Sequence, residues 1–505
     1  MQIEPQSGAF AKCYARGEPQ VVWTTLVADL ETPVSAFLKI AAGRPMSFLL
    51  ESVEGGATRG RYSIIGLEPD LLWRTLGGRA EVNRSPREAR GRFEPCAEEP
   101  LASLRSLVAE SRIKLPPALP PMAAGVFGYL GYDMVRLMEE LPSPNPDPIG
   151  IADAILMRPT IVLVFDSATD TITLVTPVRP AKGVSAQAAL TRAGERLSAI
   201  VDALEGPLDH AATNGHAGPL AVLPRSNTTP AEFERMVHAA KEYIAAGDVF
   251  QVVLAQRFEA PFELPPFALY RALRRVNPSP YLYFLDFGEF ALAGSSPEIL
   301  VKVEGGTVTI RPIAGTRPRG PTPHEDKALE DELLADPKER AEHLMLLDLG
   351  RNDVGRVAEI GTVEVTDRFF VERYSQVMHI VSNVEGALRG DRDALDALAA
   401  GFPAGTVSGA PKVRAMEIID ELETEKRGIY AGCVGYFSAA GEMDTCIVLR
   451  TALVKDGVMY VQAGAGIVAD SDPKSEQQEC INKARALFRA AEEAKRFASA
   501  ARRGQ

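Results

Sequence analysis

Two stretches of the chain each place a pair of glutamates three residues apart. Glu339 and Glu342 lie in ERAEHLMLLDLGRND, and Glu476 and Glu479 lie in SEQQECINKARALF. Residues at positions i and i+3 share one face of a helix, so each stretch can direct two carboxylates toward the same place. If the two faces meet, their oxygens suit a hard cation such as Mg²⁺, which binds few protein carboxylates and keeps positions for an anionic substrate. Such pairs are also common on solvated helices, so the spacing alone leaves a surface role open.

Apolar residues close to both pairs argue against a purely solvated position. Leu344, Met345 and Leu347 follow the first pair, and Ile481 and Leu487 follow the second. Apolar residues that recur at helical spacing indicate a face turned toward the core. The sequence therefore predicts that both glutamate pairs lie on partly buried helices.

Two glycine-rich stretches resemble nucleotide-binding motifs but break their patterns. Gly464–Ala469 reads GAGIVA, yet Asp470, Asp472 and Pro473 follow where a helix should continue. We interpret it as a strand end of small residues, whose backbone N–H groups could hold a carboxylate. Gly405–Lys412 reads GTVSGAPK and lacks the second glycine and the final hydroxyl of a phosphate loop. We interpret this stretch as a loop leading into a helix, with Pro411 at its first position.

Histidine and glutamine supply the other candidates. The histidines show no metal-ligand spacing and are scattered at positions 210, 216, 238, 324, 343 and 379. Only His379, in the strand-like VMHIV, is placed for chemistry, and the residues alone favour a structural role for it. Gln251 shares a predicted strand face with Val253 and Ala255, where a polar side chain is as compatible with structure as with function.

The elements that must position these residues are clearest in the second half. Thr229, Pro230 and Glu232 begin a helix with a capping box, and Gly247 ends it. Strands are predicted at 249–258, 281–286, 291–294 and 307–312. Helices are predicted at 323–348 and 411–422, and a hairpin joins 446–454 to 458–461 through Lys455-Asp-Gly457.

The first half has the pattern of an antiparallel meander. Strands are predicted at 47–53, 61–67, 151–165 and 171–175, and a helix over 190–204 ends at Gly206. Residues 206–224 have little periodicity. We therefore divide the chain into an N-terminal domain (1–205), a linker (206–228) and a C-terminal domain (229–505), which contains the candidate residues named above. There is neither an internal repeat nor a βαβ alternation, so the pattern does not favour a doubly wound sheet.

Composition narrows the class of protein. With 505 residues, 46% of them hydrophobic, the chain can bury a large core. The net charge is −12 and there is no basic run, so we expect no nucleic-acid partner. There is no membrane-length apolar stretch and no hydrophobic signal core, so we expect a cytoplasmic protein. The five cysteines form no CxxC pair and are expected to be reduced.

Six longer motifs carry a family resemblance, namely RPIAGTR (311–317), ERAEHLMLLDLGRND (339–353), FPAGTVSGAPK (402–412), QAGAG (462–466), LLES (49–52) and NPSPY (277–281). On these motifs the chain resembles the large, component I subunits of anthranilate synthase, among the chorismate-utilising enzymes. The resemblance covers nearly the whole chain. It implies a two-domain α+β fold in which antiparallel β-sheets pack together with helices outside.

The resemblance also implies roles for individual residues. Glu342 and Glu479 correspond to the Mg²⁺ ligands, while Glu339 and Glu476 would orient those ligands or hold bound substrate. Glu298 corresponds to the general acid and His379 to the histidine of the later elimination step. The residues that correspond to chorismate contacts are Gly315, Thr316, Tyr430, Arg450, Gly464, Ala465, Gly466 and Lys483. Arginine and backbone amides are suitable partners for the two carboxylates of chorismate.

The reaction implied is addition of ammonia to chorismate with loss of a hydroxyl, followed by elimination of pyruvate and aromatisation. Isochorismate synthases, which use water, carry a lysine base where this chain has Gln251. Aminodeoxychorismate synthases (component I) carry a nucleophilic lysine where this chain has Ala314. Both differences favour anthranilate formation, and these two activities are the alternatives.

Partners and regulation follow from the same resemblance. The cysteines lack the context of a glutaminase nucleophile, so we expect a separate glutamine amidotransferase subunit that supplies ammonia, in a hetero-oligomer. Glu51 and Ser52, with Pro280, Tyr281 and Leu282, correspond to a site for feedback inhibition by L-tryptophan; without the resemblance, LLES would be read as a buried strand.

Two other classes of protein were weighed against this reading. A pure tryptophan sensor would not need the predicted catalytic set. A paired-carboxylate glycosidase would have an aromatic-rich cleft, whereas this chain has two tryptophans. Magnesium dependence would separate both classes from the expected enzyme.

Overall fold

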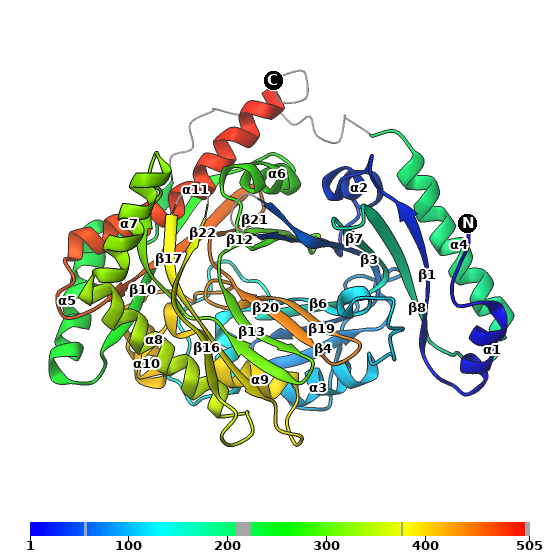
Figure 1. Cartoon of the computed structure of the whole chain (residues 1–505), viewed down its shortest axis with the longest axis horizontal. Helices are drawn as coiled ribbons and strands as arrows, with labels where there is room; N and C mark the ends of the chain where they lie inside the picture. The colour runs from blue at the N-terminus through cyan, green and yellow to red at the C-terminus, as the bar shows by residue number, and fades with distance from the viewer. Residues whose placement is uncertain (55–57, 209–223, 375–376, 500–505) are drawn as a thin grey trace.

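The computed structural model of the chain describes residues 1–54, 58–208, 224–374 and 377–499 (Figure 1). Most of the predicted linker lies outside these residues, and the division into two domains stays a prediction. No helix within the described ranges is long and apolar enough to cross a membrane.

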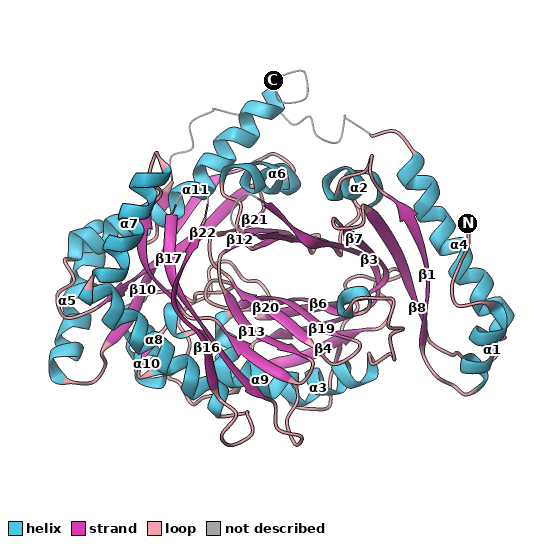
Figure 2. Cartoon of the chain, in the orientation of Figure 1, coloured by secondary structure: helices cyan, strands magenta, loops and turns pink. Residues whose placement is uncertain are grey.

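Antiparallel strands occupy the centre of the molecule (Figure 2). The first half contributes β1 (Gln20–Val27), β2 (Ser47–Glu54), β3 (Thr58–Leu76), β4 (Arg79–Asn83), β5 (Glu94–Pro95), β6 (Gly125–Leu130), β7 (Ala154–Asp166) and β8 (Thr171–Val178). The second half contributes β9 (Arg225–Ser226), β10 (Gln251–Pro261), β11 (Tyr281–Asp286), β12 (Phe290–Ser296), β13 (Ile299–Glu304), β14 (Thr307–Ile310), β15 (Ile313–Pro318), β16 (Glu364–Arg373), β17 (Val377–Ala387), β18 (Gly409–Ala410), β19 (Cys433–Ser438), β20 (Met443–Ile447), β21 (Thr451–Lys455) and β22 (Val458–Ile467).

Strand pairing joins the two halves of the chain. β2 pairs with β11, and β6 pairs with β19, both antiparallel. The sheet also curls strongly. β2 and β6 are separated by β3 and β7 in the ladder, which in a flat sheet would hold them about 14 Å apart. Yet the rings of Phe48 on β2 and Phe127 on β6 stack with centroids 4.6 Å apart, so the two strands face each other across a shared core.

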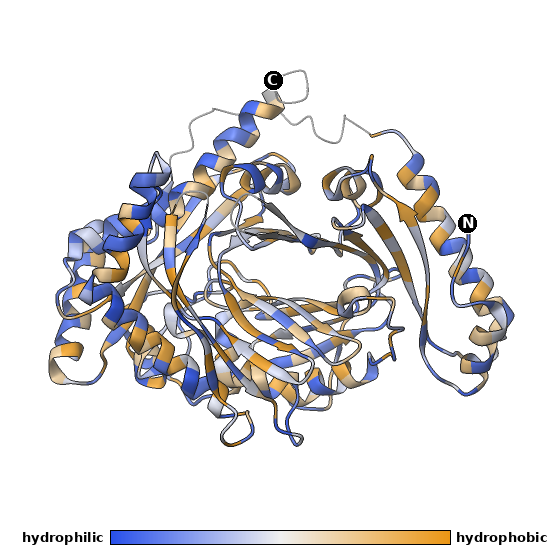
Figure 3. Ribbon diagram, in the orientation of Figure 1, coloured by the Kyte–Doolittle hydropathy of each residue, from blue (hydrophilic) through white to orange (hydrophobic). Residues whose placement is uncertain are grey.

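Helices lie outside the strands (Figure 2). They are α1 (Ser7–Ala15), α2 (Pro33–Ile40), α3 (Pro100–Glu110), α4 (Ala186–Glu205), α5 (Pro230–Ala246), α6 (Pro266–Val276), α7 (Pro323–Ala335), α8 (Pro337–Gly355), α9 (Ala394–Gly401), α10 (Lys412–Leu422) and α11 (Pro473–Ser499). Hydrophobic and hydrophilic residues alternate along α4 (Figure 3), and its buried stripe includes Leu190, Leu197 and Leu204. The predicted α+β class, with antiparallel sheets packed together and helices outside, is confirmed.

The capping signals of α5 act as the sequence predicts. The Thr229 hydroxyl accepts a hydrogen bond from the Glu232 backbone, the Glu232 carboxylate accepts one from the Thr229 backbone, and Pro230 is the first helical residue. Gly247 ends the helix in the left-handed region at φ 87°. Helix α10 begins one residue later than predicted, at Lys412, because Pro411 occupies the N-cap.

The single helix predicted over 323–348 is wrong, because the structure has two helices there, α7 and α8. Pro337 has no backbone N–H and disfavours helical geometry in the residue before it, so Asp336 is extended at φ −68° and ψ 114°. The Asp336 carboxylate then caps α8 by accepting hydrogen bonds from the backbone N–H groups of Lys338 and Glu339. Glu339 therefore lies in the first turn of a new helix.

Two strand predictions also need correction. The predicted strand 307–312 stops at Ile310, and the chain forms a separate strand, β15, from Ile313. The predicted strand 446–454 is broken between β20 and β21. The break contains Arg450, whose φ of 47° is left-handed and incompatible with a strand.

Candidate active site

Strand register brings residues from distant parts of the chain together. β15 pairs with β17 so that Thr316 lies opposite His379. β10 pairs with β22 so that Val253 lies opposite Gly466. The side chain of Gln251, two residues before Val253 on β10, approaches Gly466. Glu298 follows β12, and Arg450 precedes β21, which pairs with β12. The backbone N–H of Ser295 on β12 donates to the carbonyl of Arg450 at 3.2 Å, which links β12 to the segment before β21.

Glu298 is a buried acid with one hydrogen-bond donor beside it. The residue is 6% exposed, and its Oε1 accepts a hydrogen bond from the Thr406 hydroxyl at 3.0 Å. Burial raises the pKa of Glu298 to about 8, although Thr406, Arg450 and Lys483 each oppose that rise. At neutral pH the carboxyl group therefore holds a proton and can donate it.

His379 is buried and neutral. Burial, followed by the positive charge of Arg450, lowers the pKa of His379 to about 4. Its Nδ1 lies 2.9 Å from the carbonyl oxygen of Gly315 and 3.1 Å from the Thr316 hydroxyl. Because a carbonyl oxygen can only accept, we assign the ring proton to Nδ1. Nε2 is then left with a lone pair that can accept a proton.

Arg450 is a cation without a bonded partner. Its backbone conformation places it in the break between β20 and β21, and burial lowers its pKa while Tyr374 and Glu298 raise it. Within the described part of the chain, its guanidinium makes no hydrogen bond or ion pair. A guanidinium in this state is suited to a bidentate contact with an external carboxylate.

The four predicted carboxylates are coupled to one another electrostatically through Glu342 and Glu479. Burial raises the pKa of Glu342, and the negative charges of Glu339 and Glu479 raise it further. The pKa of Glu476 is raised by burial and by Glu479. α8 and α11 therefore bring the two glutamate pairs near each other, which is the condition that the sequence analysis left open. Leu344 is the exception to the predicted apolar surroundings, because it is 56% exposed.

The carboxylates differ in the cations bonded to them. Glu339 accepts a hydrogen bond from Arg317 at 2.8 Å, and Glu479 forms an ion pair with Lys483 at 2.7 Å. Glu342 has no bonded cation in the described residues. No set of three or more acidic, histidine or cysteine side chains in the described ranges is arranged to hold a metal ion. The two carboxylates predicted as ligands, Glu342 and Glu479, would suit Mg²⁺, because that ion binds one or two protein carboxylates and completes its shell with water and substrate.

The strand of small residues offers backbone groups and close contacts. Beyond Val461, β22 pairs only with β10 among the described strands, so one edge of Gly464–Gly466 is unpaired. A Cβ on Gly464 would lie 2.8 Å from the Tyr430 hydroxyl, and one on Gly466 would lie 2.5 Å from Nε2 of Gln251. The Ala465 side chain is buried on the opposite face. Lys483 donates to the Gly464 carbonyl at 2.9 Å, linking α11 to this strand.

Gln251 ends in a buried acceptor without a partner. The residue is 3% exposed, and its Oε1 makes no hydrogen bond to any described group. A buried amide oxygen in this state is available to a donor on a bound molecule. Ala314, the residue before Gly315, is buried. Its methyl group cannot act as a nucleophile.

The residues predicted for tryptophan meet at one strand pair. Glu51 lies opposite Leu282 and Ser52 opposite Tyr281, where β2 pairs with β11, and Pro280 directly precedes β11. The Glu51 carboxylate is already bonded to Arg274 at 2.7 and 2.9 Å and accepts a hydrogen bond from the Tyr270 hydroxyl. Ser52 donates to the Tyr62 carbonyl at 3.1 Å. These residues are separate in sequence from the carboxylate and glycine elements described above.

Two residues near Glu298 were missed by sequence reasoning. Thr406 lies inside the motif 402–412, but no spacing marks it as the donor to Glu298. Tyr374, whose ring centroid lies 5.5 Å from that of His379, has no signal of its own in the sequence.

The motif 402–412 is anchored to α8, because Lys412 forms an ion pair of 2.9 Å with Asp353 in which both side chains are about one-tenth exposed.

Comparison with known proteins gives one consistent result. The family model described as chorismate binding enzyme matches residues 68–489. Anthranilate synthase component 1 of Cereibacter sphaeroides is 57% identical over 98% of this chain and 99% of its own length. The protein of that name from Thermus thermophilus is 50% identical over 93% of this chain and 97% of its own.

Solved structures agree on the fold. The crystal structure of anthranilate synthase component I from Streptococcus pneumoniae TIGR4 is 39% identical, with a TM-score of 0.75, and covers 92% of this chain and 98% of its own. The menaquinone-specific isochorismate synthase of Escherichia coli is 21% identical, with a TM-score of 0.69, and covers 96% of this chain and 100% of its own, which supports a shared fold only.

Proposed function

Because the chain belongs to the chorismate-binding enzymes, in the group of anthranilate synthase component 1, we propose that it converts chorismate and ammonia to anthranilate and pyruvate. The observation that carries this proposal is the 57% identity to an anthranilate synthase component 1 over 98% of the chain. The expected site residues support the proposal. The acid Glu298, the base His379 and the unpaired Arg450 lie on or directly beside strands of the same sheet. Anthranilate formation would make this enzyme part of tryptophan biosynthesis.

Chorismate binding is proposed to use the free cation and the unpaired strand edge. Arg450 would hold one carboxylate through a bidentate contact, and backbone N–H groups on the unpaired edge of β22 at Gly464–Gly466 would hold the other. Gly315, Thr316, Tyr430 and Lys483 would complete the contacts. The glycines permit this approach, because a side chain at position 464 or 466 would collide with Tyr430 or Gln251.

Glu298 and His379 are proposed to move protons. Hydroxide is a poor leaving group, and Glu298, protonated at neutral pH, would donate a proton to the departing hydroxyl. His379 would take part in the later loss of pyruvate through its unprotonated Nε2. The Thr406 hydroxyl would hold the Glu298 carboxyl group in position.

Mg²⁺ is proposed as the cofactor, held by Glu342 and Glu479. The bound ion would offset the charge of the chorismate carboxylate. We expect Glu342→Gln and Glu479→Gln each to abolish Mg²⁺-dependent turnover, whereas Glu364→Gln, at an exposed position on β16, should leave it intact. Undiminished turnover in both site variants would remove the metal site from the proposal.

The product separates this activity from its alternatives. Gln251 has no useful basicity with which to activate water, and Ala314 cannot form a covalent adduct with the ring. Purified protein incubated with Mg²⁺, chorismate and ammonium should therefore yield anthranilate, detected by its fluorescence and by chromatography. Isochorismate or aminodeoxychorismate as the main product would overturn the proposal.

A glutamine amidotransferase subunit is the proposed partner, in a hetero-oligomer. The isolated chain should accept ammonium but not glutamine, and an added amidotransferase subunit should make glutamine a substrate. Efficient use of glutamine by the chain alone would contradict this expectation.

L-Tryptophan is the proposed feedback inhibitor, bound beside Glu51, Ser52 and Pro280–Leu282. Ser52→Phe would fill the space next to Tyr281 and should raise the tryptophan concentration needed for half inhibition. Inhibition that is unchanged in this variant would argue against the site.

A further inference from the structure

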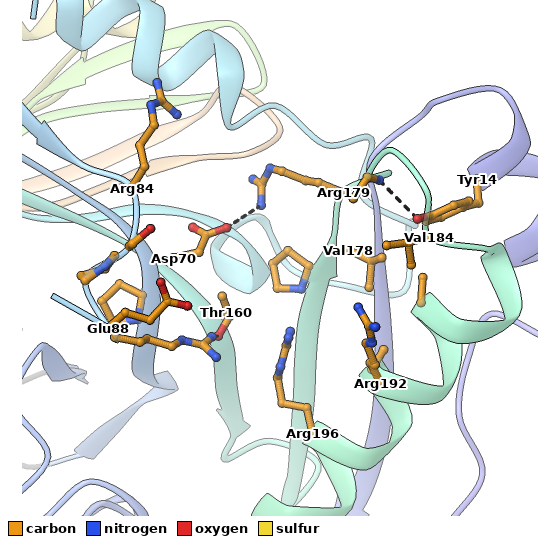
Figure 4. A pocket seen from close by; sticks show the side chains of 18 residues that line it. Tyr14, Asp70, Arg84, Glu88, Thr160, Val178, Arg179, Val184, Arg192 and Arg196 are labelled. Carbon is orange, nitrogen blue, oxygen red and sulfur yellow. Dashed lines mark hydrogen bonds and ion pairs between the residues drawn. The ribbon is translucent and has the colours of Figure 1, made fainter.

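A cavity of about 360 Å³ lies in the first half of the chain and shares no residue with the candidate active site. Its walls come from β3, the segment after β4, β7, the end of β8 and helix α4 (Figure 4). This volume is in the range of small-molecule sites. Neither the expected reaction nor the expected tryptophan site uses it.

Cations dominate the cavity wall. The lining contains five arginines, at positions 84, 87, 179, 192 and 196, against the carboxylates Asp70 and Glu88. A concave surface with an excess of one charge concentrates ligands of the opposite sign. The cavity is therefore suited to an anion.

Asp70 does little to neutralise these arginines, because Arg158 has already bound it. Arg158 donates to Asp70 at 2.7 Å and to Glu110 at 2.8 Å, whereas the closest approach of Arg179 to Asp70 is 3.8 Å. Glu110 is shared in turn with Arg84 at 2.9 Å. Asp70 and Glu110 are thus bonded mainly to Arg158 and Arg84, and Glu68 pairs with Arg87 at 3.5 Å. Arg179 is left with a weak partner.

The other wall holds the least compensated cations. Arg179 is 25% exposed, and its buried Nε has no hydrogen-bond partner in the described residues. Burial, followed by the positive charge of Arg158, lowers the pKa of Arg179 to about 10. Arg196 donates only to a neutral hydroxyl, that of Thr176, at 2.6 Å. Arg192, one turn earlier on α4, is exposed and forms no ion pair within the described ranges.

Apolar side chains line the same space. Val178 and Val184 lie beside Arg179 and Arg192 (Figure 4), and Ala189 lines the same cavity. A bare inorganic ion would leave this apolar surface unused. A ligand with an anionic group and a compact carbon skeleton would contact both parts of the wall.

We propose that this cavity is a binding site for a small organic phosphate, whose phosphate group is held by Arg179, Arg192 and Arg196 and whose carbon skeleton packs on Val178, Val184 and Ala189. A phosphate group offers several acceptor oxygens at once, which suits guanidinium groups that line one cavity from the end of β8 and from α4. The bound dianion would also compensate the charge of Arg179, which Asp70 compensates only weakly at 3.8 Å.

Phenyl phosphate is a suitable probe, because it combines a phosphate with a compact apolar body. Calorimetric titration of the full chain should detect its binding. Arg192→Gln and Arg196→Gln should each weaken binding about tenfold or more, the usual effect of losing one charged hydrogen-bond donor. Arg192 is exposed, so its replacement removes no core packing, and circular dichroism would verify that both variants fold.

Two control variants and two control ligands make the test specific. Lys182→Gln removes the same charge from an exposed residue next to the cavity that does not line it, and Arg450→Gln removes the cation of the candidate active site. Both should bind phenyl phosphate as the unchanged protein does. Inorganic phosphate and benzoate should each bind more weakly. Absent binding, equal losses in the control variants, unchanged affinity in both cavity variants, or equal affinity for either control ligand would overturn the proposal.

Discussion

Burial moves two titratable groups of the candidate active site in opposite directions. The pKa of Glu298 rises to about 8 and that of His379 falls to about 4, so both groups are uncharged at neutral pH. A protonated carboxyl group beside an unprotonated imidazole is an acid and a base ready for use at one pH. The family resemblance assigns roles to both residues, but neither protonation state can be read from the sequence, because burial is a property of the packed strands.

We expect Glu298→Gln to lower kcat by about 10²- to 10⁴-fold, the usual contribution of a general acid. The acid form of Glu298 exists below its pKa of about 8, so kcat of the unchanged protein should decline as the pH rises through 8. The variant has no such group and should lose this decline. Rates measured at saturating chorismate from pH 6 to about 9.5 test both points.

The matched control is Glu289→Gln, which makes the same chemical change at an exposed residue before β12. Its pH profile should equal that of the unchanged protein. An unaltered alkaline decline in Glu298→Gln would show that another group titrates.

The hydroxyl of Thr406 should tune this titration. Its hydrogen bond to Glu298 lowers the pKa of that carboxyl group against the effect of burial. In Thr406→Val the pKa of Glu298 should therefore rise, and the alkaline decline of kcat should shift to higher pH. Thr406→Ser keeps the hydroxyl and should restore the original profile. If the decline stays in place in the valine variant, Thr406 has only a structural role.

At the level of elements, local signals were predictive where the chemistry is local. The cap of α5 depends on residues within one turn, and it forms as expected. The break between α7 and α8 also has a local cause, Pro337, but the helical period on both sides concealed it. The break at Arg450 has no local signal, since a left-handed arginine is held there by contacts such as that between Ser295 and the Arg450 carbonyl.

The cap at Asp336 gives a stability prediction. Asp336→Ala removes the side chain that accepts from Lys338 and Glu339 and also pairs with Arg317. Losing an N-cap costs about 1 kcal/mol of unfolding free energy. Asp331→Ala, at an exposed position inside α7, should cost less than about 0.5 kcal/mol. Urea denaturation followed by circular dichroism would compare the two, and equal losses would exclude the capping role.

At the scale of the whole molecule, the sequence predicts the class of fold and the family but not the meeting of its parts. Glu298, Thr406 and Arg450 come from three separate segments, and only the pairing of distant strands brings them together. Spacing along the chain carries no information about such pairings, because each depends on how the sheet curls. The convergence of α8 and α11 was predicted only as a condition, and the electrostatic coupling of Glu342 to Glu479 meets it.

The curled core predicts that the two halves of the chain stabilise each other. Phe127, on β6, is fully buried and contacts Phe48 from the first half and Tyr436 from the second. Phe127→Ala should cost about 3–5 kcal/mol of unfolding free energy. Fluorescence and circular dichroism should report one common transition, shifted to lower denaturant.

Phe250→Ala is the control, because Phe250 is 72% exposed and its removal leaves no cavity. It should leave the transition midpoint nearly unchanged. Two separate transitions, with only one of them shifted in Phe127→Ala, would show that the halves unfold independently.

The strand order has a thermodynamic consequence. β2, which carries Glu51 and Ser52, pairs with β11, β11 pairs with β12, and β12 pairs with β21. Glu298 follows β12 and Arg450 precedes β21, so the candidate inhibitor residues and the candidate acid stand at different rungs of one hydrogen-bonded ladder. Under the proposed function, a ligand that displaces β2 would therefore also strain the strands next to the proposed chorismate site. Thermodynamic linkage then makes the effect reciprocal. Chorismate would lower the affinity for the inhibitor by the same factor by which the inhibitor lowers the affinity for chorismate.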